Sequence, residues 1–157
     1  MLIKKIYALI FSSLLSLNVY ADPKATDILG FWLSEEGRAV IEITQDGDEF
    51  KGKLVWLKVL ADGEVKEKLD DKNPDESLRS RSLLGLENLK GFHFDDGEWE
   101  DGTIYDPKSG KTYSSYMELK DQDTLKIRGY VGISLLGKTT IWKRQDKSKY
   151  QDNSQTK

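Results

Sequence analysis

Turn signals interrupt this chain at short intervals, and their spacing limits the possible folds more than any other feature of the sequence. Most of them pair an acidic or polar residue with glycine, which is typical of tight turns between strands. They lie at Glu36-Gly37, Asp46-Gly47, Asp62-Gly63, Asp96-Gly97, Ser109-Gly110, Asp121-Gln122-Asp123 and from Gly132 to Gly137. Between them apolar and polar residues alternate, as in RAVIEIT, where Ala39, Ile41 and Ile43 share one face. The pattern predicts a succession of short antiparallel strands.

Eight strands are expected from this alternation. They are placed near residues 29–34, 38–45, 49–58, 64–67, 99–106, 111–119, 124–131 and 138–144. Because tight turns join most of them, we expect an up-and-down order, and closure into a barrel would remove the exposed edges of an open sheet. An eight-stranded barrel can be filled by its own side chains or can hold one small ligand. The prediction is therefore an all-β, eight-stranded antiparallel barrel, with a two-sheet sandwich as the alternative.

One segment, between the fourth and fifth expected strands, is much longer than a hairpin turn. Within it, Asn73 is suited to cap a helix, Pro74 to occupy the first helical position and Glu76 to complete a capping box. We therefore expect a short helix over residues 74–81, in an insertion that covers one end of the barrel.

Arginine is rare in this chain, which prefers lysine, so Arg79, Arg81 and Arg128 stand out. A guanidinium can bind a carboxylate through two parallel hydrogen bonds. In the favoured interpretation these arginines pair internally and hold the insertion to the barrel. In the alternative they recognise an anionic ligand group at the barrel mouth, together with Tyr130. The possible internal partners are Asp70, Asp71, Asp75 and Asp106.

The stretch IYDPKSGKTY is interpreted as a turn, because Asp106 precedes a proline and Gly110 can adopt a positive φ. It supplies too few carboxylates for calcium, which needs about six oxygens, so no metal and no cofactor are expected. His93 is the only histidine, and alternation places it opposite Phe92 and Phe94, facing water. A catalytic role for it is disfavoured, because no Gly-x-Ser-x-Gly motif supplies a nucleophile.

The stretch from Ile133 to Leu136 is apolar although it lies at an expected hairpin turn, between Gly132 and Gly137. Such side chains gain roughly 1.5–3 kcal/mol each only when they are buried. The favoured interpretation is a plug that folds back over the barrel end. A hinged plug could also serve as a lid that brings Leu135 and Leu136 onto an apolar ligand. Insertion into a protein partner and contact with a membrane are the less favoured alternatives.

Residues 1–21 have the pattern of a cleavable signal peptide, because Lys4 and Lys5 precede a short apolar run that ends at Val19-Tyr20-Ala21. Cleavage after Ala21 would leave a barrel domain over residues 22–144 and a polar tail over 145–157, which is expected to be disordered. The net charge of the whole chain is −3, which argues against nucleic acid as a partner. The chain has no cysteine, so disulfides and thiol chemistry are excluded.

Trp32 in GFW and Arg144 in WKR would meet when the barrel closes, in a cation–π contact worth about 0.5–2 kcal/mol. This pairing resembles the structural signature of the lipocalins and the wider calycin superfamily. Five sequence blocks also look like the exported bacterial family "domain of unknown function 2147". They are GFWLSEEGRAVIEI, GKLVWL, DDKNPDESLRSRSLLGL, GTIYDPKSGKTYSSYMEL and DTLKIRGYVGISLLGKTTIWKR. The resemblance implies a calycin-like barrel in a Gram-negative periplasm, and it implies no activity.

These features together predict a periplasmic protein that binds a small, partly apolar molecule and catalyses no reaction. The candidate ligand-binding residues are Arg79, Arg81, Arg128, Tyr130, Leu135 and Leu136, and the candidate structural residues are Trp32, Arg144, Asn73, Pro74, Asp106 and Gly110. One alternative is an envelope protein-interaction module whose barrel is filled by its own side chains. Another is a hydrolase that uses paired carboxylates.

Overall fold

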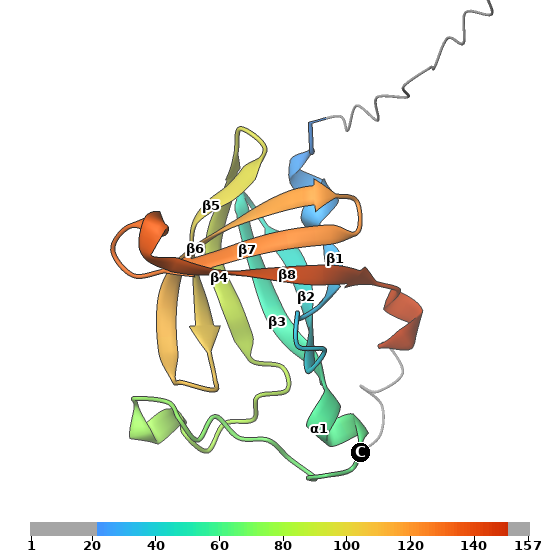
Figure 1. Cartoon of the computed structure of the whole chain (residues 1–157). Helices are drawn as coiled ribbons and strands as arrows, with labels where there is room; N and C mark the ends of the chain where they lie inside the picture. The colour runs from blue at the N-terminus through green and yellow to red at the C-terminus, as the bar shows by residue number, and fades with distance from the viewer. Residues whose placement is uncertain (1–21, 151–157) are drawn as a thin grey trace, which may run out of the picture.

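Eight antiparallel strands close into a barrel in a computed structural model that describes residues 22–150 (Figure 1). The strands are β1 (Gly30–Leu33), β2 (Ala39–Asp46), β3 (Glu49–Leu57), β4 (Glu87–Asp95), β5 (Glu98–Asp106), β6 (Lys111–Asp121), β7 (Thr124–Tyr130) and β8 (Gly137–Gln145). Each strand pairs with the next in the sequence, and β8 pairs with β1, where Arg144 lies opposite Trp32. The all-β up-and-down barrel is therefore confirmed, and the sandwich alternative is wrong.

The insertion lies between β3 and β4, not between the fourth and fifth strands. The fourth strand was expected at residues 64–67, but it is β4, over residues 87–95. The reason is a break in the alternation: Leu89 and Phe92 are both fully buried although they are three residues apart. Gly91, between them, has a φ of 72° and lies where the pairing with β3 shifts register. Because of this bulge, the sequence of β4 lacks the regular alternation of apolar and polar residues that marks a strand.

The helix expected over residues 74–81 is also absent from the insertion. Helical turns in this region are α1 (Lys58–Ala61), directly after β3, and the short 3-10 turn η2 (Glu76–Leu78). Asp75 caps η2, because its carboxylate accepts a hydrogen bond from the Ser77 amide at 2.9 Å. Asn73 instead accepts a bond from the Asp75 amide, two residues further on, at 2.9 Å. Asn73 thus forms a local turn ahead of η2 and is not its cap.

The two ends of the barrel are built differently. At one end, which we call the closed end, the 3-10 turn η1 (Ala25–Ile28) lies across the opening. The insertion lies at the opposite end, the insertion end, beside the β5–β6 turn (Figure 1). Because turns alternate between the ends of an up-and-down barrel, the β7–β8 turn also belongs to the insertion end.

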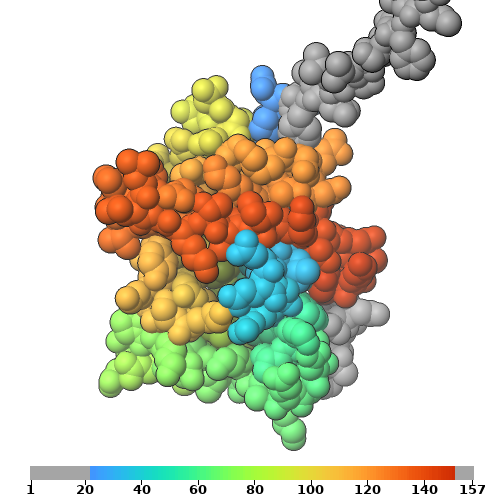
Figure 2. Space-filling model, viewed as in Figure 1, coloured from blue at the N-terminus to red at the C-terminus, as the bar shows by residue number. Residues whose placement is uncertain are grey.

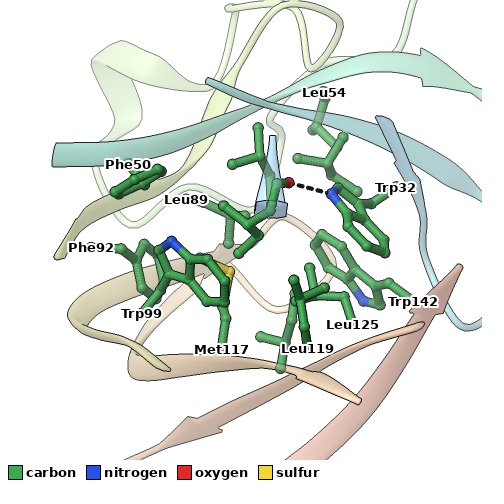
Figure 3. Close-up of a cluster of buried hydrophobic side chains, with 14 of the residues drawn as sticks. Trp32, Phe50, Leu54, Leu89, Phe92, Trp99, Met117, Leu119, Leu125 and Trp142 are labelled. Carbon is green, nitrogen blue, oxygen red and sulfur yellow. Dashed lines mark hydrogen bonds between the residues drawn. The ribbon is translucent and has the colours of Figure 1, made fainter. Parts of the chain in front are cut away.

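Large apolar side chains fill the barrel interior from the closed end to Leu54 and Leu57 of β3 and Leu83 of the insertion (Figure 3). The closed end is where two of the largest lie. Trp32 and Trp99 are fully buried there, and each indole N–H donates to a backbone carbonyl of the η1 segment. The Trp32 donor reaches the Ile28 oxygen at 2.8 Å, and the Trp99 donor reaches the Ala25 oxygen at 3.2 Å. Burying a large apolar side chain contributes roughly 1.5–3 kcal/mol. The two tryptophans therefore stabilise the core and hold η1 in place.

The first residues of the polar tail pack against the barrel. The 3-10 turn η4 (Lys147–Lys149) follows β8, and the ring of Tyr150 lies 6.3 Å from Phe31 and 6.0 Å from Trp56, centre to centre. These ring contacts give the polar segment an apolar anchor. The rest of the tail, from 151 onward, and the expected signal peptide, 1–21, lie outside the described residues. Within residues 22–150, no helix has the length and apolar character needed to cross a membrane.

Candidate functional site

A buried carboxylate joins the insertion to the barrel wall. Asp70 has no exposed surface, and it accepts hydrogen bonds from Tyr105 of β5 at 2.5 Å and from the Asn73 amide group at 2.8 Å. The Arg81 guanidinium completes its shell with contacts of 2.9 Å from Nε and 2.8 Å from Nη2. We call these four residues the Asp70 cluster. Because Tyr105 belongs to the barrel and the other three to the insertion, the cluster acts as a latch.

The electrostatics of the Asp70 cluster favour the charged carboxylate. Burial alone would raise the pKa of Asp70, but the hydrogen bonds from Tyr105, Asn73 and Arg81 outweigh burial and lower the pKa below its ordinary value. Burial and the bond to Asp70 together raise the pKa of Tyr105 to about 12. The phenol therefore stays protonated and continues to donate at any physiological pH.

The arginines of the insertion are engaged within the chain. Arg81 pairs with Asp70, as the favoured interpretation predicts. Arg79 donates from Nε to the Asn73 carbonyl at 2.8 Å and lies 3.2 Å from the Glu76 carboxylate. Arg81 therefore helps to hold the insertion to the barrel, through Asp70 and Tyr105. The hydrogen bonds of Arg79 go to Asn73 and Glu76 of the insertion itself, so Arg79 does not hold the insertion to the barrel as expected.

The β5–β6 turn, expected from its turn chemistry, abuts the insertion. The Asp106 carboxylate accepts bonds from the Lys108 amide at 3.0 Å and from the Ser109 hydroxyl at 2.7 Å. Gly110 has a φ of 70°, and a side chain there would collide with the carbonyl oxygen of Lys72. Glycine is therefore required both for the backbone angle and for the close approach of the insertion.

An unpartnered hydroxyl lies on the inner wall at the insertion end. Ser115 of β6 has no exposed surface, and its Oγ is one of two buried side-chain oxygens without a hydrogen-bond partner within residues 22–150; the other is Oδ1 of Asn88. The residues that pair with Ser115 in the sheet are Gly102 of β5 and Gly129 of β7. Neither adjacent strand therefore offers the Ser115 hydroxyl a side chain.

The walls around this hydroxyl are apolar and partly open to solvent. The ring of Phe92 occupies the space above Gly102, while Ile104 and Tyr113 lie within van der Waals distance of the point that a Cβ atom would occupy at Gly129. Both Ile104 and Tyr113 keep partial exposure although they point into the barrel. Sequence reasoning missed Ser115 as a site residue. The available signal was one small polar residue, Ser115, among Tyr113, Met117 and Leu119 on the inward face.

The apolar stretch of the β7–β8 turn does not plug the barrel. Val131, Ile133, Leu135 and Leu136 are 58 to 83% exposed, and the turn projects from the side of the molecule (Figure 2). We call residues 131–136 the apolar tip. The plug prediction is wrong, because Leu135 and Leu136 lie outside the barrel opening in this structure.

Arg128 explains why the tip points outward. Its side chain lies on the outer wall and donates to the Ser134 carbonyl at 2.6 Å, the Leu135 carbonyl at 3.1 Å and the Thr139 hydroxyl at 2.8 Å. These bonds hold the tip against the outside of β7. Arg128 thus orients the tip, and Tyr130 lines an outer pocket beside it.

The pair expected at the barrel seam is present, and it lies at the closed end. The Arg144 guanidinium is 4.1 Å from the centre of the Trp32 ring. The same group donates to the carbonyls of Leu29 at 2.9 Å, Asp27 at 2.6 Å and Gln122 at 2.6 Å. Arg144 therefore ties η1, the last strand and the β6–β7 turn together.

His93 lies on the outer wall, as alternation predicts. Its imidazole is half-exposed, and its Nδ1 is 3.9 Å from the Asp48 carboxylate in the β2–β3 turn.

A closed eight-stranded barrel with an arginine over a tryptophan at its seam gives the chain a lipocalin-like fold. A solved structure with this architecture is "Protein HP1028 from the human pathogen Helicobacter pylori", which is described as belonging to the lipocalin family. The two structures align with a TM-score of 0.69 over 82% of this chain and 90% of that one, at 22% identity. No curated protein matches the chain.

The sequence itself matches a bacterial family over residues 30–144, which is nearly the whole barrel. The chain belongs to domain of unknown function 2147, described as "uncharacterized protein conserved in bacteria". The resemblance found from the sequence is thereby confirmed.

Proposed function

We propose that this chain is a non-catalytic periplasmic protein that binds a small, partly apolar molecule at the insertion end of its barrel. The observation that carries the proposal is the Ser115 hydroxyl, which is fully buried and has no partner within residues 22–150. A buried polar group left unpaired costs about 1–3 kcal/mol. A ligand group that hydrogen-bonds to Oγ would remove this cost on binding.

The surroundings of Ser115 support a particular ligand chemistry. Ile104 and the ring of Tyr113 give the neighbouring inner wall a mostly apolar, partly exposed surface, and the Ser115 hydroxyl is fully buried. Small-molecule sites combine mostly apolar walls with a few placed polar groups. The ligand would therefore carry one hydrogen-bonding group on an apolar body, and the lipocalin-like barrel suits such a molecule.

Two other functions have less support. A hydrolase with paired carboxylates would need acids around an enclosed substrate, but Glu98, Glu100 and Asp101 gather on the outer wall. An envelope interaction module with a filled barrel would leave the Ser115 hydroxyl unexplained, although the apolar tip is consistent with a partner.

The binding proposal can be tested with N-phenyl-1-naphthylamine, a fluorescent molecule with one N–H donor between apolar rings. We expect the parent protein to bind it and Ser115→Ala to bind it about three- to tenfold more weakly, the value of one hydrogen bond. Ser114→Ala, on the outward face of the same strand, is the matched control and should bind like the parent. So should Leu135→Ser with Leu136→Ser, because the tip points away from the barrel.

Absence of probe binding to the parent would contradict the proposal. Equal affinity of the parent and Ser115→Ala would contradict the role of the hydroxyl.

The location forms a separate part of the proposal. If the first 21 residues are a signal peptide, protein extracted from the periplasm should begin at Asp22, since cleavage follows Ala21. N-terminal sequencing that finds Met1 on the periplasmic protein would refute this.

A further inference from the structure

The apolar tip is an unusual surface. Within residues 22–150, seven large apolar side chains are exposed, and four of them, Val131, Ile133, Leu135 and Leu136, lie in this one turn. Single exposed apolar residues are normal, but a contiguous group on a soluble protein marks a contact site. The outward direction of the tip means that the barrel itself does not use these side chains.

The tip is also held in a fixed conformation. Arg128 bonds to two carbonyls of the tip and to Thr139 of β8. At its base, Gly137 lies so close to the backbone of β7 that a side chain would come within 2.6 Å of the Gly129 carbonyl oxygen. A surface that is already ordered loses less conformational entropy on binding. The tip is therefore preorganised for binding.

An acidic pocket of about 360 Å³ adjoins the tip on the outer wall. Ser134 of the tip contributes to its lining, together with Tyr116, Tyr130, Glu98, Glu100 and Asp101. Within the described part of the chain, no basic side chain forms an ion pair with any of these three acids, whereas the neighbouring Glu118 pairs with Lys120 and Lys126. Burial and then the nearby carboxylates of Glu118 and Glu100 raise the pKa of Glu98, whereas the charge of Lys126, whose Nζ lies 5.3 Å from the centre of the Tyr116 ring, lowers it. The three acids of the lining outnumber this one lysine, so the pocket keeps negative charge that a further cation could neutralise.

We propose that the apolar tip and the acidic pocket together dock a segment of another protein that carries apolar residues next to a lysine or arginine. The apolar residues would pack on the tip, and the basic side chain would enter the pocket and approach Glu98, Glu100 and Asp101. Charge decides between a protein and a membrane: the carboxylates beside the tip and the net charge of −3 repel anionic lipids. This surface is on the outer wall and is independent of the ligand site at Ser115.

The test uses a fluorescently labelled amphipathic peptide of leucine and lysine, its twin with glutamate in place of lysine, and vesicles of phosphatidylcholine and phosphatidylglycerol. We expect the full chain to bind the lysine peptide, and Leu135→Ser with Leu136→Ser to weaken binding by about tenfold or more. Glu98→Gln with Glu100→Gln should weaken it severalfold and reduce the preference for lysine over glutamate.

Leu84→Ser is the matched control, because Leu84 is an exposed leucine in the insertion, 44% exposed and far along the chain from the tip. It should bind the lysine peptide like the parent, and circular dichroism should show all variants folded. The proposal is overturned if the two tip or acid variants bind like the parent, or if the glutamate twin binds equally well. It is also overturned if only the vesicles bind.

Discussion

The two ends of this barrel are covered in different ways. At the closed end, η1 lies on two buried tryptophans whose indole N–H groups are both satisfied, and Arg144 bonds to three carbonyls around them. At the insertion end, the polar Asp70 cluster and the buried Leu83 hold the cover, and the inner wall keeps the unpartnered hydroxyl of Ser115. The first end is optimised for stability, and the second retains an unsatisfied group that a ligand could use.

Removal of the Asp70 carboxylate, at the insertion end, should reduce the free energy of unfolding most. Asp70→Ala would leave Arg81, Tyr105 and Asn73 without their shared acceptor. A hydrogen bond to a charged group contributes about 1.5–3 kcal/mol, so we expect the loss of three of them to cost more than about 3 kcal/mol. Urea denaturation should report this loss. Asp71→Ala is the control, because Asp71 is exposed and its ion pair to Lys68 spans 3.9 Å. Similar midpoints for the two variants would show that the latch contributes little.

Loss of the seam arginine should have the next largest effect, at the closed end. Arg144→Ala removes the stacking on Trp32 and three charged hydrogen bonds to carbonyls, and we expect a loss of about 2–3 kcal/mol. Arg38→Ala is a suitable comparison, since Arg38 is exposed and pairs with the nearby, also exposed Glu36. A denaturation midpoint as high as that of the parent would argue against closure of the barrel by this residue.

Acid should weaken the insertion end before the closed end. Because the folded-state pKa of Asp70 is lowered, its stabilising contribution is complete above the ordinary carboxyl pKa of about 4 and is lost as the pH falls below that value. Amide hydrogen exchange at low pH should therefore show the insertion opening while the strands around Trp32 stay protected. Asp70→Asn should lack this pH dependence. Equal exchange at both ends would mean that the latch is not the acid-sensitive element.

Ser115→Ala should change the free energy of unfolding least, and it is the only one of these substitutions expected to increase stability. The substitution removes a buried unpaired hydroxyl, so the ligand-free protein should become more stable by about 1 kcal/mol. Ser114→Ala, on the outer face, should leave the denaturation midpoint almost unchanged. A loss of stability in Ser115→Ala would show that the hydroxyl already has a partner in the folded chain.

Local patterns were sufficient to predict most of the fold. Seven of the eight strands lie where the alternation and turn residues place them, because those signals depend on neighbouring residues. The fourth was missed because the glycine bulge at Gly91 brings Leu89 and Phe92 to the same face at a spacing that is typical of a helix. The Arg144–Trp32 pair could be predicted because closure of the barrel joins the two ends of the sequence.

The site depended on contacts between distant residues, so the sequence predicted less of it. Ser115 is unpartnered because Gly102 and Gly129, on two different strands, both flank it. The tip points outward because Arg128 bonds to its carbonyls, although the same apolar residues could equally have formed a plug. In both cases the sequence identifies the unusual residues, and the tertiary contacts decide their role.

Native mass spectrometry of the full chain, purified from the periplasm without denaturation, tests the ligand site most directly. The parent protein should carry a small-molecule adduct that is released on unfolding, and the fraction carrying it should fall in Ser115→Ala and stay unchanged in Ser114→Ala. A clean mass for the parent, or the same adduct on Ser115→Ala at parental occupancy, would contradict a binding site built around Ser115.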